Sequence, residues 1–386
     1  MGIKFISKLF EVLETSQKLR ITLFAGFVLV ITFLETFSLG MFYPFLQSIT
    51  NNEVNIKVSE ILLKINDQFN FSINIELTAL SLFAFLIVMK NLLIFYFEFW
   101  QANFIRDLKV SLKNKILKKH FEDDYENISN IKTSTYVRDF SSTVDLFLKN
   151  LQNGMRLIIE FSVFLGLLGL LLLIQSSQTL YLVGTVGFIA FVFSFVVKNT
   201  LKKMGAKNLS YNDRTLGKLL DILNSTKEIL MFRKSDIFIK QYKNLEFKNL
   251  TLVRNASIIS KVPKFFFEIL VVISFTFYIF FISQNNQNIN ELIPQLGIFF
   301  LVIIRILPAI TKILFYTTKL KWGEVAALKI ADDINIYNKI LSNKETYQEI
   351  DFEKSLELKN VSFEYKNRGN EILKNLNLII NKGDYV

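Results

Sequence analysis

The sequence predicts an all-α membrane protein with six transmembrane helices, long polar extensions of those helices, and a short β-rich segment after them. Three observations support this prediction: 51% of the 386 residues are apolar, 40 residues are phenylalanine, and the mean hydropathy is positive at +0.35. The charged residues, 20% of the chain, are segregated from the apolar runs instead of being interleaved with them as in soluble amphipathic helices. Apolar runs of about 20 residues are long enough to cross the hydrocarbon core of a bilayer.

The segment 1–20 is polar with apolar residues at helical spacing, which predicts an amphipathic helix on the membrane surface. A membrane domain is expected over 21–320, a linker over 321–355 and a separate β-rich segment over 356–386. The six predicted spans within the membrane domain are 21–48, 77–100, 157–174, 180–197, 265–282 and 292–316. The two long polar connections, 101–156 and 198–264, are expected to be helices that continue past the bilayer and turn at short tips.

Lysine and arginine are concentrated before the first span and in the two long connections, whereas the opposite side has only Lys57 and Lys64 in its first loop. By the positive-inside rule, both termini and both long connections are expected on the cytoplasmic side of the cell inner (plasma) membrane. This distribution accounts for the net charge of +11, so nucleic-acid binding is not expected. The chain has no cysteine, which excludes disulfides and Cys-ligated metals, and its one histidine, His120, is interpreted as a solvated helix residue.

The residues from 356 onward alternate between apolar and polar types, which is the period of a β-strand. The alternating apolar residues are Leu356, Leu358, Val361 and Phe363 in one run, and Leu376, Leu378 and Ile380 in the next. The segment 381–384, Asn-Lys-Gly-Asp, predicts a turn.

These features together resemble the exporter-type ABC transporters, and three short motifs add to the resemblance. The run 361–365, Val-Ser-Phe-Glu-Tyr, looks like the opening of an ABC nucleotide-binding domain. The run 381–385 looks like the turn that leads to the phosphate loop of that domain, and Lys-Glu-Ile at 227–229 with Phe232 resembles the entry to the second coupling helix.

The resemblance implies a type I six-helix exporter fold, a homodimer, ATP and Mg as cofactors of the intact protein, and an ATPase-coupled translocase activity. It implies that Tyr365 stacks on adenine and that the loop tips act as coupling helices, around Tyr125 and Asn127 in one connection and Arg233 and Asp236 in the other. The phosphate loop and the later ATPase motifs are not in this chain, so we expect a truncated protein that neither binds ATP usefully nor hydrolyses it alone.

Within that family, the sequence is most similar to flippases of lipid-linked oligosaccharides. An apolar face over 54–69 predicts a short external helix that could contact a polyprenyl tail. Lys90 and Arg305 lie mid-span and Lys264 lies at the end of a span, and a charge in the hydrocarbon core must face a cavity or a partner. Three cations suit a pyrophosphate headgroup, although lysine binds it as a point charge and less rigidly than arginine does. Glu35 is a candidate counter-ion in the same cavity.

Structural pairing is the alternative interpretation of these charges. Lys90 would then pair with Glu35 and Arg305 with Glu268, while Lys264 would extend to the membrane interface. Two alternatives also remain for the function. The protein could export a peptide, another lipid or a drug, or it could be a non-catalytic channel or a subunit that works with a separate ATPase.

Overall fold

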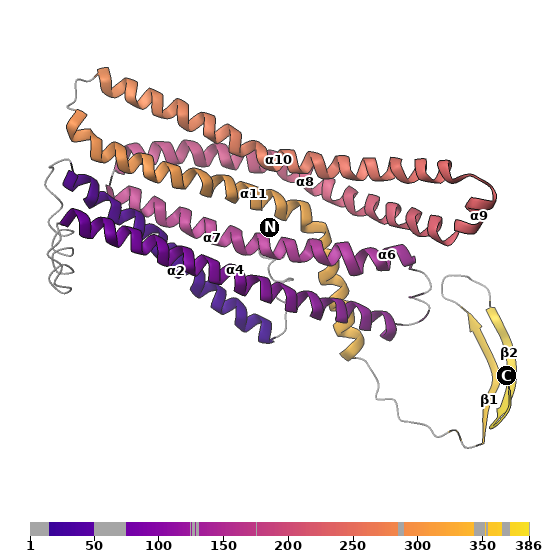
Figure 1. The fold of residues 1–386 in the computed structure, drawn as a ribbon. Coiled ribbons are helices and arrows are strands. Elements are labelled where there is room, and N and C mark those ends of the chain that lie inside the picture. The colour runs from indigo at the N-terminus through magenta and orange to yellow at the C-terminus, as the bar shows by residue number, and fades with distance from the viewer. Residues whose placement is uncertain are drawn as a thin grey trace.

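A computed structural model describes residues 15–49, 75–123, 125, 128, 131–174, 176–284, 289–342, 352, 354–364 and 371–385. Within these residues, long helices lie side by side in an elongated bundle, and a two-stranded sheet stands apart from them (Figure 1). The predicted external helix over 54–69 lies outside the described residues. Of the predicted surface helix over 1–20, only 15–20 are described, and they form the start of the first helix.

Most of the described chain is helical, and the longest helices exceed the thickness of a bilayer. The elements are α2 Thr15–Ile49, α4 Ile75–Glu122, α6 Thr133–Arg138, the π-helix η1 Asp139–Thr143, α7 Val144–Ile174, α8 Ser176–Asn224, α9 Thr226–Met231, α10 Ser235–Gln284 and α11 Ile289–Ser342. The helices α4, α8, α10 and α11 have 48 to 54 residues. At 1.5 Å per residue they are roughly 70 to 80 Å long, against a hydrocarbon core of about 30 Å. The predicted continuation of helices well beyond the apolar runs is therefore confirmed.

Three helical segments among the described residues are long and apolar enough to cross a membrane: Leu19–Gly40, Leu80–Glu122 and Thr133–Leu170. They overlap the first three predicted spans. The other three predicted spans fall in α8, α10 and α11, where many side chains lie outside the described set. The structure thus supports a membrane protein, while the count of six spans and the orientation of the termini stay predictions.

Among the described residues, a large buried core lies in the polar half of the bundle, where α4, α7 and α11 meet. Its centre is a cluster of fully buried apolar side chains that includes Leu112, Phe147 and Ile330. The buried Ala327 and Ala331 allow α11 to approach its neighbours closely, because an alanine side chain needs little room. The helix α11 continues to Ser342, so the first part of the expected linker over 321–355 is helix packed into the bundle.

The helices α8 and α11 touch through their backbones. A Cβ atom at Gly205 would lie 2.1 Å from the carbonyl oxygen of Trp322, a distance that no real side chain can adopt. Only glycine therefore fits at this point of α8 without a shift of one helix.

An ionic network joins η1 to two other helices in the polar half. Arg138 pairs with Asp139 at 2.9 Å and with Asp213 of α8 at 3.2 Å, and Lys329 of α11 pairs with Asp139 at 2.5 Å. Thr143 and Thr135 add hydroxyl donors to the two aspartates, at 3.0 and 3.1 Å. Because every carboxylate here has both a cation and a hydroxyl partner, the network holds η1 against α8 and α11.

The C-terminal strands β1 Ser355–Glu364 and β2 Glu371–Asn381 form an antiparallel hairpin in which Leu358 faces Leu378. The two strands predicted from alternation are confirmed. The predicted turn is confirmed as well, since Asp384 N–H donates to the Asn381 carbonyl at 3.0 Å and Gly383 has a φ of 101°, which favours glycine.

Candidate anion site in the helical bundle

Three of the charged residues singled out in the sequence meet at one point in the apolar half of the bundle. The carboxylate of Glu35 on α2 pairs with Lys90 of α4 at 3.0 Å through Oε2, and with the Arg305 guanidinium of α11 through Oε1. The Glu35 side chain is 2% exposed, the Lys90 side chain 14% and the Arg305 side chain 29%. We call these three residues the Glu35 centre.

Tight packing of α2 against α7 holds Glu35 in place. A Cβ atom at Gly166 of α7 would lie 2.3 Å from the side chain of Thr36, so the two helices are in close contact beside the centre. On the next turn of α2, the Ser38 hydroxyl donates to the Glu35 carbonyl at 2.9 Å. The neighbouring apolar side chains Ile31 and Leu167 are buried. Glu35 therefore has a fixed backbone and an apolar surrounding.

The Glu35 centre carries one negative and two positive charges, so it has a net charge of +1. A charge at this depth is costly in hydrocarbon, where each cation needs a partner or a cavity. One carboxylate serves both cations here, with one oxygen directed to each. An anion that entered the centre would meet a positive surplus already assembled from three helices.

Lys264 does not join this centre through any contact among the described residues. It lies 3.8 Å from Glu268 one turn later on α10, and both side chains are well exposed, at 63% and 47%. Glu268, the partner expected for Arg305 under structural pairing, thus pairs with Lys264, while Arg305 pairs with Glu35. The expected pairing of Lys90 with Glu35 is present.

Two further ion pairs were not predicted. Lys312 of α11 pairs with Glu160 of α7 at 2.7 Å, and Arg156 of α7 pairs with Glu98 of α4 at 2.8 Å. Lys312 follows Arg305 by two helical turns, so both project from the same face of α11. That spacing is a signal in the sequence that could have placed Lys312 near the candidate site.

Farther along α11, Glu324 is paired with two lysines beyond the predicted span. Lys202 of α8 and Lys321 donate to its carboxylate at 3.0 and 3.1 Å. Burial alone would raise the pKa of Glu324, but the two lysine hydrogen bonds outweigh burial and hold this pKa below its ordinary value. Glu324 is therefore ionised near neutral pH and links α8 to α11.

The predicted coupling residues lie at the polar tips of the bundle, as far as they are described. Tyr125 is exposed, Arg233 ends the turn after α9 with a φ of 50°, and Asp236 is in the first turn of α10. Asn127 and Tyr365 lie outside the described residues. The tip formed by α9 carries exposed Leu230, Met231 and Phe232, an apolar surface at the end of the bundle.

The described residues contain no group of three or more His, Cys, Asp or Glu that could hold a metal ion. The chain matches no known protein-family profile. The functional assignment therefore depends on the chemistry of the Glu35 centre and on the motifs of the sequence.

Proposed function

We propose that this chain is the membrane domain of an ATP-driven ABC-type exporter that moves a polyprenyl-pyrophosphate-linked oligosaccharide, or a similar lipid, across the inner membrane. The observation that carries the proposal is the positive surplus of the Glu35 centre. Two cations from different helices meet one carboxylate in the apolar half of the bundle.

A pyrophosphate diester matches this surplus in charge and in hydrogen bonding. It carries two negative charges, and the guanidinium of Arg305 can donate two parallel hydrogen bonds to phosphate oxygens. Lys90 adds a flexible point charge from α4. Burial of the lipid tail in the membrane would offset the free energy of desolvating the anion at this depth. A soluble anion has no such compensation.

Glu35 would act as a substitute for the anion. It pairs with Lys90 and Arg305 and offsets part of their charge. A bound pyrophosphate would compete with Glu35 for the same donors. Release would then be aided by return of the Glu35 carboxylate, so that the ligand is held firmly but not irreversibly.

The pump part of the proposal is supported by the long helices and by the apolar α9 tip, which offers a surface for an ATP-hydrolysing domain. The motif-bearing segment 356–386 would be the start of that domain, with ATP and Mg as its cofactors and Tyr365 against adenine. In a homodimer, closure of two such domains on ATP would favour one orientation of the bundle, and hydrolysis would reset it.

The test of the cargo uses the chain itself in phosphatidylcholine nanodiscs. Binding of a polyprenyl pyrophosphate, a polyprenyl monophosphate and a polyprenol would be compared by native mass spectrometry. We expect the pyrophosphate to bind most tightly, and Lys90→Gln and Arg305→Gln each to weaken it roughly tenfold or more. Lys264→Gln is the matched control, since it removes the same charge from an exposed site. Equal binding of all three lipids, unchanged in both variants, would point to another cargo.

A second experiment tests coupling to ATP. A nucleotide-binding domain is joined after Val386, and the ATPase activity of the fusion in liposomes is measured with and without the polyprenyl-pyrophosphate oligosaccharide. Stimulation that is lost in the Lys90→Ala, Arg305→Ala double variant supports the flippase. Movement of the lipid without ATP would instead support a channel.

A further inference from the structure

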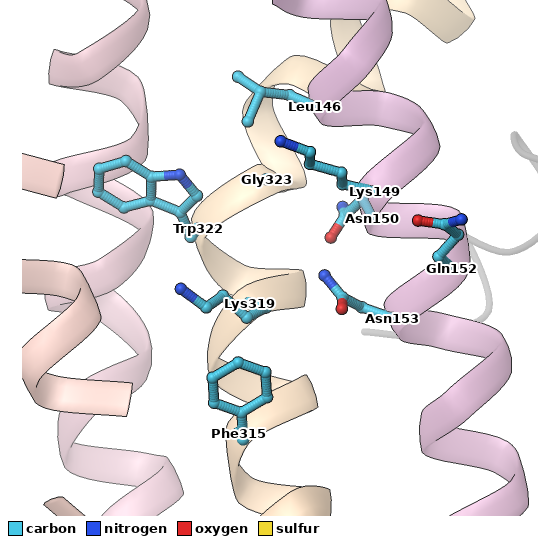
Figure 2. Close-up of a pocket in the computed structure, with 9 residues that line it drawn as sticks. All are labelled: Leu146, Lys149, Asn150, Gln152, Asn153, Phe315, Lys319, Trp322 and Gly323. Carbon is cyan, nitrogen blue, oxygen red and sulfur yellow. The ribbon is translucent and has the colours of Figure 1, made fainter. Parts of the chain in front are cut away.

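A second group of cations surrounds a cavity elsewhere in the bundle, between α7 and α11. The cavity has a volume of about 320 Å³, and its lining includes Lys149, Asn150, Gln152, Asn153, Lys319 and Trp322 (Figure 2). Two of these residues are lysines and three are amides, and none is acidic. Figure 2 shows Lys149, Asn150 and Asn153 extending from α7 toward α11.

A smaller cavity of about 120 Å³ shares Lys319 and Trp322 with the first one. It adds the hydroxyl groups of Ser257 and Ser260 on α10 and of Thr318 on α11. The two cavities thus adjoin at Lys319 and Trp322, and their lining combines side chains of α7, α10 and α11. Their lining contains many hydrogen-bonding groups and no carboxylate.

The lysines that line these cavities have no carboxylate beside them in the lining. Among the described residues, Lys149, Lys261 and Lys319 form no ion pair, and the Lys319 ammonium lies 5.3 Å from the centre of the Phe315 ring. Burial, together with the charges of Lys261 and Lys149, lowers the pKa of Lys319. Burial and the two nearby charges therefore disfavour the charged form of Lys319, and an anion beside Lys319 would favour it.

One buried acceptor is also left without a donor. Asn150 is 2% exposed, its amide nitrogen donates to the Leu320 carbonyl at 3.5 Å, and its Oδ1 has no hydrogen-bond partner. An unpaired buried oxygen is costly, so a ligand that brings a hydroxyl group would be favoured there. The cavity therefore favours a ligand that carries both an anionic group and a hydroxyl donor.

The depth of the cavities matches that of lipid headgroups. Lys319 follows the predicted sixth span, and Asn153 and Ser260 precede the predicted third and fifth spans, all by a few residues. At 1.5 Å per residue, Lys319 and Lys149 lie about 5 and 12 Å beyond the ends of the predicted sixth and third spans. Lys319 is also about 21 Å along α11 from Arg305, so this is a separate site from the Glu35 centre.

We propose that these cavities form a second anion site, which binds the phosphate of a hydroxyl-bearing headgroup at the membrane surface. Lys149 and Lys319 are its charge partners, and Asn150 accepts a hydrogen bond from a neighbouring hydroxyl. The proposal goes beyond the exporter function and does not depend on it. The same chemistry is offered by a lipid headgroup and by a free sugar phosphate, and the experiment separates these two sources.

The test uses Trp322 as an internal reporter. The chain has only two tryptophans, Trp100 and Trp322, so Trp100→Phe leaves Trp322 as the single indole. In one arm, the protein in phosphatidylcholine nanodiscs is titrated with glucose 1-phosphate, glucose or inorganic phosphate. In the other arm, the nanodiscs contain increasing phosphatidylinositol or, for comparison, phosphatidylserine, which has the same net charge but no polyol.

We expect a saturable change of Trp322 emission with glucose 1-phosphate or with phosphatidylinositol, and the arm that responds identifies the source. Lys149→Gln and Lys319→Gln should each weaken binding roughly tenfold, and higher salt should weaken it further. The control is Lys203→Gln, which removes an exposed lysine at a similar depth on α8 that lines neither cavity.

The proposal is overturned if neither arm changes the emission, or if both lysine variants respond with the same midpoint as the parent. Equal responses to phosphatidylinositol and phosphatidylserine would overturn the role of Asn150 and the hydroxyl groups. Native mass spectrometry of the headgroup-bearing lipid on the two lysine variants, with both tryptophans present, repeats the comparison if Trp100→Phe disturbs the fold.

Discussion

Two charged clusters in this bundle differ in the balance of their charges. In the polar half, Arg138 and Lys329 face Asp139 and Asp213, so positive and negative charges are equal in number and hydroxyl groups support both carboxylates. The Glu35 centre in the apolar half has two cations for one carboxylate, and among the described residues no hydroxyl or amide supports that carboxylate. A balanced cluster fastens helices together, whereas a cluster with a surplus of positive charge favours the binding of an anion.

The strongest test of this contrast is Glu35→Gln. Removing the shared carboxylate leaves the partly buried Lys90 and Arg305 without this counter-ion, and we expect a loss of about 2 to 4 kcal/mol in the free energy of unfolding. A polyprenyl pyrophosphate should raise the melting temperature of this variant more than that of the parent, because it replaces the missing charge. Both quantities can be measured in detergent by denaturant and thermal unfolding. A variant as stable as the parent would mean that the cations already have other partners.

Asp139→Asn tests the balanced cluster in the same way and should cost about 2 to 3 kcal/mol, since Arg138 and Lys329 lose a partly buried partner. Here the lipid should give no additional stabilisation over the parent. Asp145→Asn is the matched control, because its pair with Lys109 is 2.6 Å long but exposed and is worth less than about 1 kcal/mol. Recovery of the Asp139 variant by the pyrophosphate lipid would erase the distinction between the two clusters.

Gly205→Ala tests the close backbone contact between α8 and α11. The helix α11 contributes Arg305 to one charged cluster and Lys329 to the other. The new Cβ would meet the Trp322 carbonyl, so we expect a loss of about 1 to 3 kcal/mol despite the better helix propensity of alanine. Gly169→Ala is the control, since a Cβ there has no atom within 4 Å, and it should be neutral or stabilising by up to about 1 kcal/mol. Equal melting temperatures for the two variants would show that the helices can separate at little cost.

The smallest effect is expected for Lys264→Gln. Its pair with Glu268 spans one turn of α10 and is exposed, so the loss should stay below about 0.5 kcal/mol. Thermal unfolding of this variant beside Lys90→Gln compares an exposed lysine with a largely buried one. A loss as large as that of Lys90→Gln would place Lys264 in the charged interior as well.

Elements with a strong local pattern could be predicted from the sequence. The long helices and the hairpin were predicted correctly, because apolar runs and strict alternation depend only on residues near one another in the chain. The end of α11 was not predicted, since no sharp change of composition marks Ser342.

The candidate site could be predicted only in part, because it depends on which helices become neighbours. The pairing of Lys90 with Glu35 was among the alternatives. The pairing of the same carboxylate with Arg305, which is distant in the sequence, was not predicted. The cavity of Lys149 and Lys319 was not predicted either. Lysines beside a span also set the orientation of a membrane protein. The presence of lysine at these positions therefore could not separate anion binding from the orientation signal.

The π-helix η1 has a consequence for how α6 and α7 are aligned. A π-helix corresponds to one residue inserted into an α-helix, and one residue corresponds to a rotation of about 100°. The insertion therefore sets the phase between α6 and α7. Deletion of one residue within 139–143 would leave an unbroken α-helix but would turn α6 by that angle about its axis. Arg138 would then leave Asp213, so a single surplus residue determines which face of α6 is presented to α8.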